Sequence, residues 1–308
     1  MTTMSEEIRE PEQPTAEEIV AALRSAGWLL EQETEASLRA AGYNTTMGHA
    51  FPDPDDPSVS REIDVTGYQQ LYQSQELALS VGVRVIAECK QSTMPYVLVG
   101  RPPDRSLSRS RIEQQFRFNS VEVGQTPLGD GRTRLNQVDA RQYLGLLALP
   151  GNPWDMDFVG TQMTRLDRRK TWLADNRGIF TSLVYPLAKA LTYFRSQGPR
   201  TSYVDHKPGR DWASIVFYYP IVVTSSPVHV VDTTEEPLTP RRVPWATMSR
   251  QIKAKNIEGQ FYVDVVTSQS LDDYLAQRIS TFTAEVARLA EAEPKRFVTH
   301  KDHSYSAP

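Results

Sequence analysis

The sequence predicts an α/β protein in which helices flank a central mixed sheet. Residues 81–90 alternate apolar side chains with others at the period of two that a β-strand shows. Residues 61–67 and 214–224 read as further strands, rich in β-branched and aromatic residues. Residues 28–41 and 183–194 instead repeat apolar side chains at helical spacing. Helices and strands therefore interleave along a chain of 308 residues, which is long enough to bury a large core.

The strand at 81–90 ends in a charged pair. Glu88 and Lys90 are two residues apart, so both side chains project from the same face of the strand. A carboxylate and an ammonium at the end of an apolar strand either form a structural ion pair or hold a metal ion and a water molecule. Cys89 faces the opposite side, where we expect a small buried side chain rather than a nucleophile.

The strand at 61–67 carries Asp64 between two apolar residues. Pairing this strand with 81–90 would bring Asp64 beside Glu88. The short segment that joins them suits a long hairpin excursion rather than a domain.

An amphipathic helix is predicted upstream, at 28–43. Glu31 and Glu35 flank its apolar stripe, and Gly42 is a natural C-terminal cap. The chain order is therefore a helix with Glu, a strand, a strand with Asp, and a strand with Glu-x-Lys.

Asp64, the Glu88-Cys89-Lys90 triplet and the helix from Leu30 to Tyr43 resemble the PD-(D/E)XK, or restriction-endonuclease-like, nuclease superfamily. In several branches of this superfamily a helical Glu lies about eleven residues before a Gly-aromatic pair, and Glu31 lies at that spacing before Gly42 and Tyr43. The resemblance covers residues 16–99. It implies a restriction-endonuclease-like core of helix, three strands, helix and strand, here with an insertion and a C-terminal extension.

The resemblance also implies a chemistry that suits these residue types. Asp64 and Glu88 would bind Mg²⁺, for which Mn²⁺ can substitute, with the backbone carbonyl of Ala87 or Cys89 as a further ligand. Lys90 would orient or help deprotonate the attacking water, or stabilise the phosphorane. Glu31 would help to hold a second ion. Two adjacent carboxylates repel each other unless a cation lies between them, which favours a metal site.

Other acidic residues compete with Asp64 for this role. Asp53, Asp55 and Asp56 lie in a segment whose prolines indicate a loop rather than a strand. Asp264 lies in a strand pattern, but no strand that carries Glu-x-Lys follows it. Asp64 therefore remains the predicted ligand.

The charge of the chain is unevenly distributed. Its net charge is −4, yet residues 1–18 hold six Glu against one Arg, so the remainder sums to about +1. We expect a disordered acidic head at 1–15, ending at Thr15 as a helix N-cap with Glu18 in a capping box. The nuclease-like domain would span 16–293, with an insertion at about 101–180, and 294–308 would be a flexible tail.

Two basic segments follow the predicted site. The first is either a phosphate-binding segment or a solvated one, and its nucleic-acid-binding candidates are Arg101, Arg105, Arg109 and Arg111. The second, within the insertion, is a candidate for substrate contact and contains Arg165, Arg168, Arg169 and Lys170. A helix is predicted at 140–149 between them.

The C-terminal half returns to clear periodicity. We predict a helix from 183 to Gly198, strands at 214–224, 228–232 and 261–267, and a long helix capped by Ser270. The first helix and the strand after it would complete the core that the resemblance implies.

The expected function is that of a Mg²⁺-dependent endonuclease acting on DNA, in genome or antiphage defence, as a homodimer or with a protein partner. DNA repair or RNA cleavage is the alternative use of the same site. A protein that binds nucleic acid or a partner without cutting is the alternative from another class. The single cysteine excludes an intramolecular disulfide, and no apolar run reaches transmembrane length, so we expect a cytoplasmic protein without membrane contact.

Overall fold

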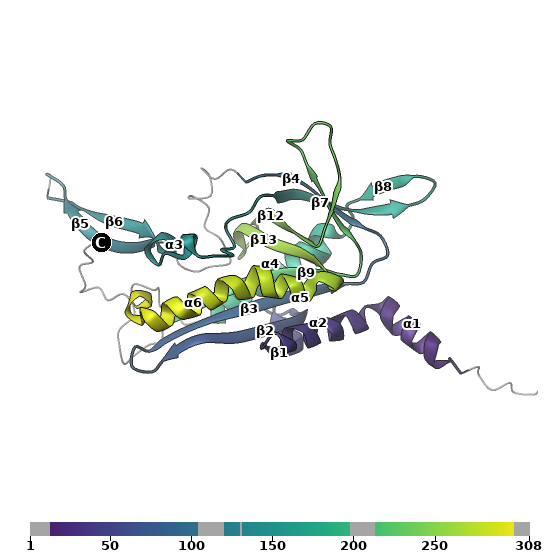
Figure 1. Ribbon diagram of the computed structural model, residues 1–308, viewed down its shortest axis with the longest axis horizontal. Helices are drawn as coiled ribbons and strands as arrows, with labels where there is room; N and C mark the ends of the chain where they lie inside the picture. Colours follow the sequence, from purple (N-terminus) through teal and green to yellow (C-terminus); the bar gives the residue numbers. More distant parts are fainter. Residues whose placement is uncertain (1–12, 104–119, 130, 198–212, 299–308) are drawn as a thin grey trace, which may run out of the picture.

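The structure is a computed structural model that describes residues 13–103, 120–129, 131–197 and 213–298. In these residues helices flank a large mixed sheet, which confirms the predicted α/β class (Figure 1). The order of strands across this sheet is β1-β2-β3-β9-β13-β12-β7-β4-β10-β11, and β8 pairs with β7 outside that path. A separate hairpin is formed by β5 and β6.

The strands have the following bounds: β1 (Asn44–Pro52), β2 (Ser60–Ser74), β3 (Leu79–Lys90), β4 (Tyr96–Arg101), β5 (Ser120–Pro127), β6 (Thr133–Asp139), β7 (Val159–Arg168), β8 (Trp172–Asp175), β9 (Ala213–Thr224), β10 (Val228–Asp232), β11 (Arg241–Val243), β12 (Trp245–Lys253) and β13 (Glu258–Thr267).

The helices are α1 (Ala16–Ala26), α2 (Trp28–Ala40), α3 (Ala140–Tyr143), α4 (Tyr185–Gln197), α5 (Leu271–Tyr274) and α6 (Thr281–Ala292). Short 3₁₀ turns occupy Leu146–Ala148, Ser268–Ser270 and Pro294–Phe297, and π-helical turns occupy Phe180–Val184 and Leu275–Ser280.

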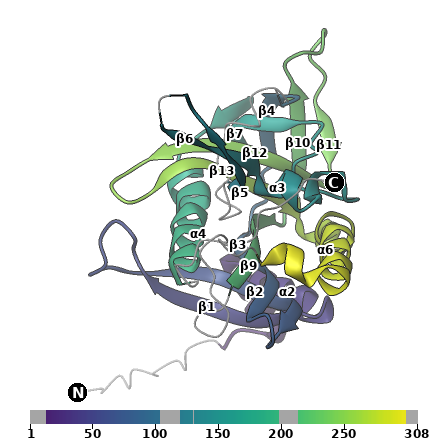
Figure 2. The same ribbon diagram turned by 90° about the vertical axis from the view of Figure 1, so that its left-hand side faces the viewer.

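Strand β3 lies at the centre of the first four strands. It pairs antiparallel with β2 from Leu79 to Ala87 and parallel with β9 over its whole length. One face of β3 packs with α2, α5 and α6, and the other face packs against α4. Figure 2 shows α4 and α6 on opposite sides of these strands. The backbone of β3 is therefore covered on both faces and held on both edges as far as Ala87, and its last three residues are held by β9.

The two N-terminal helices follow their sequence signals. Thr15 caps α1, and Glu18 closes the predicted capping box by accepting from the Thr15 backbone N–H at 2.8 Å. Gly27 separates α1 from α2 with a φ of +90°, a left-handed conformation that glycine adopts without strain. Gly42, just beyond α2, is also left-handed and ends that helix as expected.

The chain crosses twice from the first strands to the rest of the sheet, and the two crossings run side by side. One joins β3 to β4 and the other joins β9 to β10. Strand β3 pairs parallel with β9 where the crossings begin, and β4 pairs parallel with β10 where they end. The Ser225 hydroxyl accepts from the Ser92 N–H at 2.9 Å and donates to the Ser92 carbonyl at 3.0 Å. The Ser225 N–H donates to the Lys90 carbonyl at 3.3 Å. These bonds hold the end of β3 against the second crossing.

The segment between the two predicted strands forms a long hairpin, as expected, because β2 continues through its polar residues to Ser74 and a tight turn at 75–78 leads into β3. Two other expectations about individual elements were wrong. The helix predicted at 140–149 breaks at Gly145, whose φ is +76°, into one α-helical turn and one 3₁₀ turn. Ser270 makes no capping bond, since its side chain accepts from the Thr267 hydroxyl instead.

The ends and the middle of the chain also differ from expectation. The tail is not loose from Pro294 onward, because Phe297 is fully buried in the core and Val298 is buried beside it. The predicted insertion at 101–180 supplies β7, which pairs with both β4 and β12 inside the main sheet. Residues 1–12 of the acidic head and 299–308 of the tail lie outside the described residues.

Candidate active site

The pairing of β2 with β3 brings Asp64 and Glu88 together. Val65 and Ala87 form the last registered pair, and Asp64 and Glu88 are the next residues on the two strands, close enough for Asp64 to raise the pKa of Glu88. The Cys89 N–H donates to Asp64 Oδ2 at 2.6 Å, which fixes the Asp64 carboxylate against the end of β3. The juxtaposition predicted from the sequence is therefore present.

Glu88 and Lys90 form an ion pair at this strand end. Lys90 Nζ lies 2.7 Å from Glu88 Oε1, and the side chain of Lys90 is 31% exposed. Glu88 itself is buried, and its second oxygen, Oε2, has no hydrogen-bond partner among the described residues. A buried carboxylate oxygen without a partner is costly unless a cation or a donor reaches it.

The electrostatics of the cluster reflect crowding of negative charge. Burial, followed by repulsion from Asp64, raises the pKa of Glu88 to about 7 in spite of Lys90. Burial also raises the pKa of Asp64, against the hydrogen bond from Cys89. Burial lowers the pKa of Lys90, but the charge and hydrogen bond of Glu88, together with Asp64 and Tyr96, outweigh it and leave that pKa raised. Below about pH 7 the metal-free cluster therefore favours a proton on Glu88, whereas Lys90 stays charged.

Of the two helical acids, Glu31 is the one beside the cluster. Burial and then the charge of Asp64 raise the pKa of Glu31, and Glu31 in turn contributes to the raised pKa of Glu88. Glu35 instead accepts hydrogen bonds from Thr45 and Arg39, which lower its pKa. Glu35 therefore holds α2 against β1, while Glu31 lies within electrostatic reach of Asp64 and Glu88.

Cys89 faces α2, as expected of a residue between Glu88 and Lys90. Its thiol donates to the Thr34 hydroxyl at 3.4 Å, and burial raises its pKa to about 12, which rules against a thiolate nucleophile. Since the N–H and C=O of one strand residue point to the same neighbouring strand, the Cys89 carbonyl is directed toward the β2 side, where Asp64 lies.

Two neighbours of the cluster were not singled out from the sequence. Glu62, two residues before Asp64 on β2, contributes to the raised pKa of both Asp64 and Glu31. Tyr96 at the start of β4 is buried and interacts electrostatically with Lys90. The alternation of the segment around Asp64 was a signal for Glu62, whereas Tyr96 reaches Lys90 only through the tertiary structure.

The competing acids have structural roles. Asp53 is 2% exposed and accepts hydrogen bonds from Lys189 of α4 at 2.5 Å and from Arg61 at 2.7 Å. These two cations hold the pKa of Asp53 at about 2, although burial alone would raise it. Asp55 accepts from the Tyr185 hydroxyl at 2.5 Å. These pairs fasten the loop after β1 to α4, consistent with the choice of Asp64 over the loop acids.

Asp264 is likewise part of the core. It is buried on β13, and both of its oxygens are occupied, by the hydroxyls of Thr247 and Tyr274 at 2.6 Å each. A carboxylate saturated by two hydroxyl donors has no oxygen free for a substrate or a metal ion.

The predicted phosphate-binding arginines are mostly outside the described residues. Arg105, Arg109 and Arg111 all fall there, and only Arg101 is placed, exposed at the end of β4. Their role in binding nucleic acid stays a prediction.

The site offers few ready-made metal ligands. Within the described ranges, no group of three or more His, Cys, Asp or Glu side chains is placed so as to hold a metal ion. Asp64, Glu88 and the Cys89 carbonyl do, however, provide the oxygen donors that Mg²⁺ takes in sites with one or two carboxylates. Glu88 Oε2, buried without a partner, is an oxygen that a cation would satisfy. The residues present fit a magnesium site completed by water and substrate.

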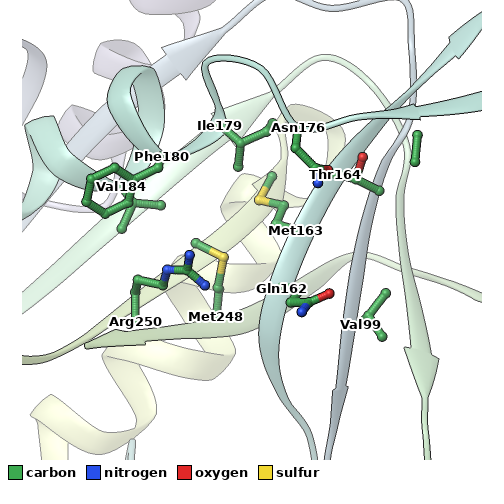
Figure 3. Close-up of a pocket in the computed structure, with 11 residues that line it drawn as sticks. Val99, Gln162, Met163, Thr164, Asn176, Ile179, Phe180, Val184, Met248 and Arg250 are labelled. Atoms are coloured by element: carbon green, nitrogen blue, oxygen red, sulfur yellow. The ribbon is translucent and has the colours of Figure 1, made fainter. Parts of the chain in front are cut away.

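A separate pocket of about 410 Å³ lies on another part of the sheet. Figure 3 shows Met163 of β7 and Met248 of β12 in this pocket, with Arg250 and Asn176 also among its lining residues. Neither Asp64, Glu88, Lys90 nor Glu31 lines it. The pocket is therefore distinct from the acidic cluster.

Comparison with known proteins adds no assignment: no family model, curated protein or solved structure matches the chain. None of the described helices is long and apolar enough to span a membrane.

Proposed function

We propose that this protein is a Mg²⁺-dependent endonuclease that hydrolyses phosphodiester bonds in DNA at the Asp64–Glu88–Lys90 cluster. The observation that carries the proposal is the placement of Asp64 beside Glu88, with Lys90 paired to Glu88 at the end of a buried strand. A structural ion pair alone would need neither a second carboxylate beside it nor a buried carboxylate oxygen without a partner.

The connectivity around the site supports a restriction-endonuclease-like core. The chain runs α2, β1, β2, β3, and later α4 and β9, with β9 parallel to β3. This is the order of helix, three strands, helix and strand that the sequence resemblance implies. The resemblance also makes genome or antiphage defence in the cytoplasm the expected setting.

In this proposal Asp64, Glu88 and the Cys89 carbonyl would hold Mg²⁺, and Glu31 would add negative charge for a second ion. Mg²⁺, or Mn²⁺ in its place, would neutralise charge that develops on the phosphorane oxygens. Lys90 is placed to donate hydrogen bonds to the attacking water or to the phosphate. Its raised pKa keeps it a cation, so orientation of the water and stabilisation of negative charge suit it better than proton abstraction.

The test is cleavage of supercoiled, linear and single-stranded DNA and of RNA, with Mg²⁺, Mn²⁺ or EDTA. We expect the wild type to cut DNA only with a metal ion, and Asp64→Ala, Glu88→Ala and Lys90→Ala each to abolish cutting while remaining folded. Glu76→Ala is a matched control, because Glu76 is an exposed carboxylate in the turn at the other end of the same hairpin. Wild-type cutting by Asp64→Ala or Glu88→Ala would refute the proposal.

A further inference from the structure

The hairpin of β7 and β8 carries an unusual set of exposed side chains. Trp172 and Leu173 are 49% and 47% exposed at the start of β8. Arg168, Arg169 and Lys170, at the end of β7 and in the turn, are exposed as well. Large apolar side chains and cations thus share one short hairpin, in a protein whose net charge is −4.

The hairpin begins close to the candidate active site. The Leu166 N–H donates to the Pro95 carbonyl at 2.9 Å, and Pro95 follows Lys90 by five residues. Five residues span at most about 18 Å, so the base of the hairpin lies within that reach of Lys90. Arg165 pairs in register with Tyr96, the residue that interacts electrostatically with Lys90. Figure 1 shows the hairpin, labelled β8, projecting beyond the rest of the sheet.

The acids of the hairpin are already paired. Asp175 binds Arg177 at 2.9 Å and Arg165 at 3.5 Å, and Asp167 lies 3.5 Å from Arg169. Residues 165–177 hold five Lys or Arg against these two carboxylates, a local net charge of +3.

One cation is stacked on the exposed tryptophan. Arg168 pairs across the hairpin with Trp172, and its guanidinium lies 5.1 Å from the centre of the indole ring. This contact holds a cation and an aromatic face side by side in the free protein. Lys170 adds a second exposed cation at the turn.

We propose that the β7–β8 hairpin enters a groove of the duplex DNA whose backbone is cut at the Asp64–Glu88–Lys90 cluster. Arg168 and Lys170 contact phosphates, and Trp172 and Leu173 contact the sugars and bases between them. A two-stranded β-ribbon fits the major groove, which is about 12 Å wide. The proposal rests on the proposed nuclease function and names the form of its substrate.

A protein partner suits this surface less well. The cores of protein–protein interfaces are depleted of charged residues, particularly lysine. Here the exposed Trp172 and Leu173 lie just beyond a run of three cations, Arg168 to Lys170, that the single carboxylate of Asp167 does not balance. Combined cation and aromatic contacts are instead what nucleic-acid-binding surfaces use.

The test measures binding in the Lys90→Ala background, so that cutting does not obscure affinity. A labelled duplex and its single strand are titrated over a range of salt concentrations. For Arg168→Gln with Lys170→Gln we expect the slope of log K against log salt to fall by about two on the duplex. Trp172→Ala should raise the Kd at least about fivefold, and Trp172→Phe should keep most of the affinity.

The matched control replaces two exposed cations elsewhere, Arg288→Gln with Lys295→Gln on and just after α6, at the opposite end of the molecule from the hairpin (Figure 1). It should leave affinity and salt slope unchanged. Unfolding temperatures confirm that the variants are folded.

The outcomes separate the two proposals. If the wild type cuts DNA but the hairpin variants bind the duplex with the affinity and salt slope of the control, the hairpin proposal fails and the nuclease function stands. If the hairpin variants lose affinity for the single strand alone, the assignment to a duplex groove is wrong. If the wild type neither binds nor cuts any of these nucleic acids, both proposals fail.

Discussion

Replacing Glu88 by Gln should stabilise the metal-free protein. The pKa of Glu88 is about 7 against an ordinary 4.5, because burial and Asp64 disfavour its ionised form. At about 1.4 kcal/mol per pH unit, ionisation of Glu88 destabilises the metal-free fold by roughly 3 kcal/mol above pH 7. Gln removes the charge and keeps an oxygen that accepts a hydrogen bond from Lys90.

The sign of the pH dependence follows from the raised pKa. Below the ordinary pKa of 4.5, the Glu88 carboxyl is protonated in both folded and unfolded chains, so the substitution brings no gain. The gain grows as the pH rises from 4.5 to about 7 and is complete above that. With an unfolding entropy of ~2.1 cal/mol/K per residue over 308 residues, ~3 kcal/mol corresponds to about 5 °C in Tm.

The assay is thermal unfolding of the wild type and Glu88→Gln in EDTA, and then in Mg²⁺, across this pH range. Mg²⁺ should raise the Tm of the wild type, because it binds only the folded state, and should have a much smaller effect on Glu88→Gln. Two results would refute the reasoning: a Tm for the metal-free variant below that of the wild type at every pH, or an equal response of both proteins to Mg²⁺.

Three further predictions use other parts of the structure. Glu31→Gln should lose much of the DNA cleavage activity and recover part of it at high Mn²⁺. Glu35→Gln should keep the wild-type cleavage rate but unfold at a lower temperature. If Glu35→Gln alone were inactive, the wrong helical acid would have been assigned. Asp53→Asn should lower the free energy of unfolding by roughly 3 kcal/mol by leaving Lys189 without its buried partner. Because the pKa of Asp53 is about 2, that loss should be full above its ordinary pKa of 3.8 and vanish as the pH falls toward 2, so equal denaturation midpoints at neutral pH would contradict it. Arg101→Gln should flatten the salt dependence of DNA binding by about one unit of slope, and an unchanged slope would show that Arg101 contacts no phosphate.

The elements that form the candidate site were predictable because they combine dense apolar residues with a clear period. Strand β3 is buried on both faces, and its sequence alternates around Glu88 and Lys90. The assignment of Glu31 also agreed with its placement, since the spacing to Gly42 fixes where on α2 an acid lies at the level of β3.

Other elements were missed where tertiary contacts override the local pattern. Strand β12 is polar at many positions, such as Gln251, and it is a strand because it pairs along its length with β13. The burial of Phe297 was hidden because neighbouring polar residues made the whole tail read as solvated. Tyr96 influences Lys90 only because of where the crossing from β3 to β4 places it, which no local period indicates.

The hydrogen bonds between Ser92 and Ser225 join the chain segment after β3 to the chain segment after β9. The β7–β8 hairpin is hydrogen-bonded to Pro95, just before β4. A force on β4 or on this hairpin therefore reaches Lys90 by two routes, along the crossing from β3 to β4 and through the bonded crossing from β9 to β10. A force on the hairpin would therefore displace the end of β3, with Glu88 and Lys90, along with it. In hydrogen exchange, the amides of Ser92 and Ser225 should open only together with β3 and β9, as parts of one cooperative unit.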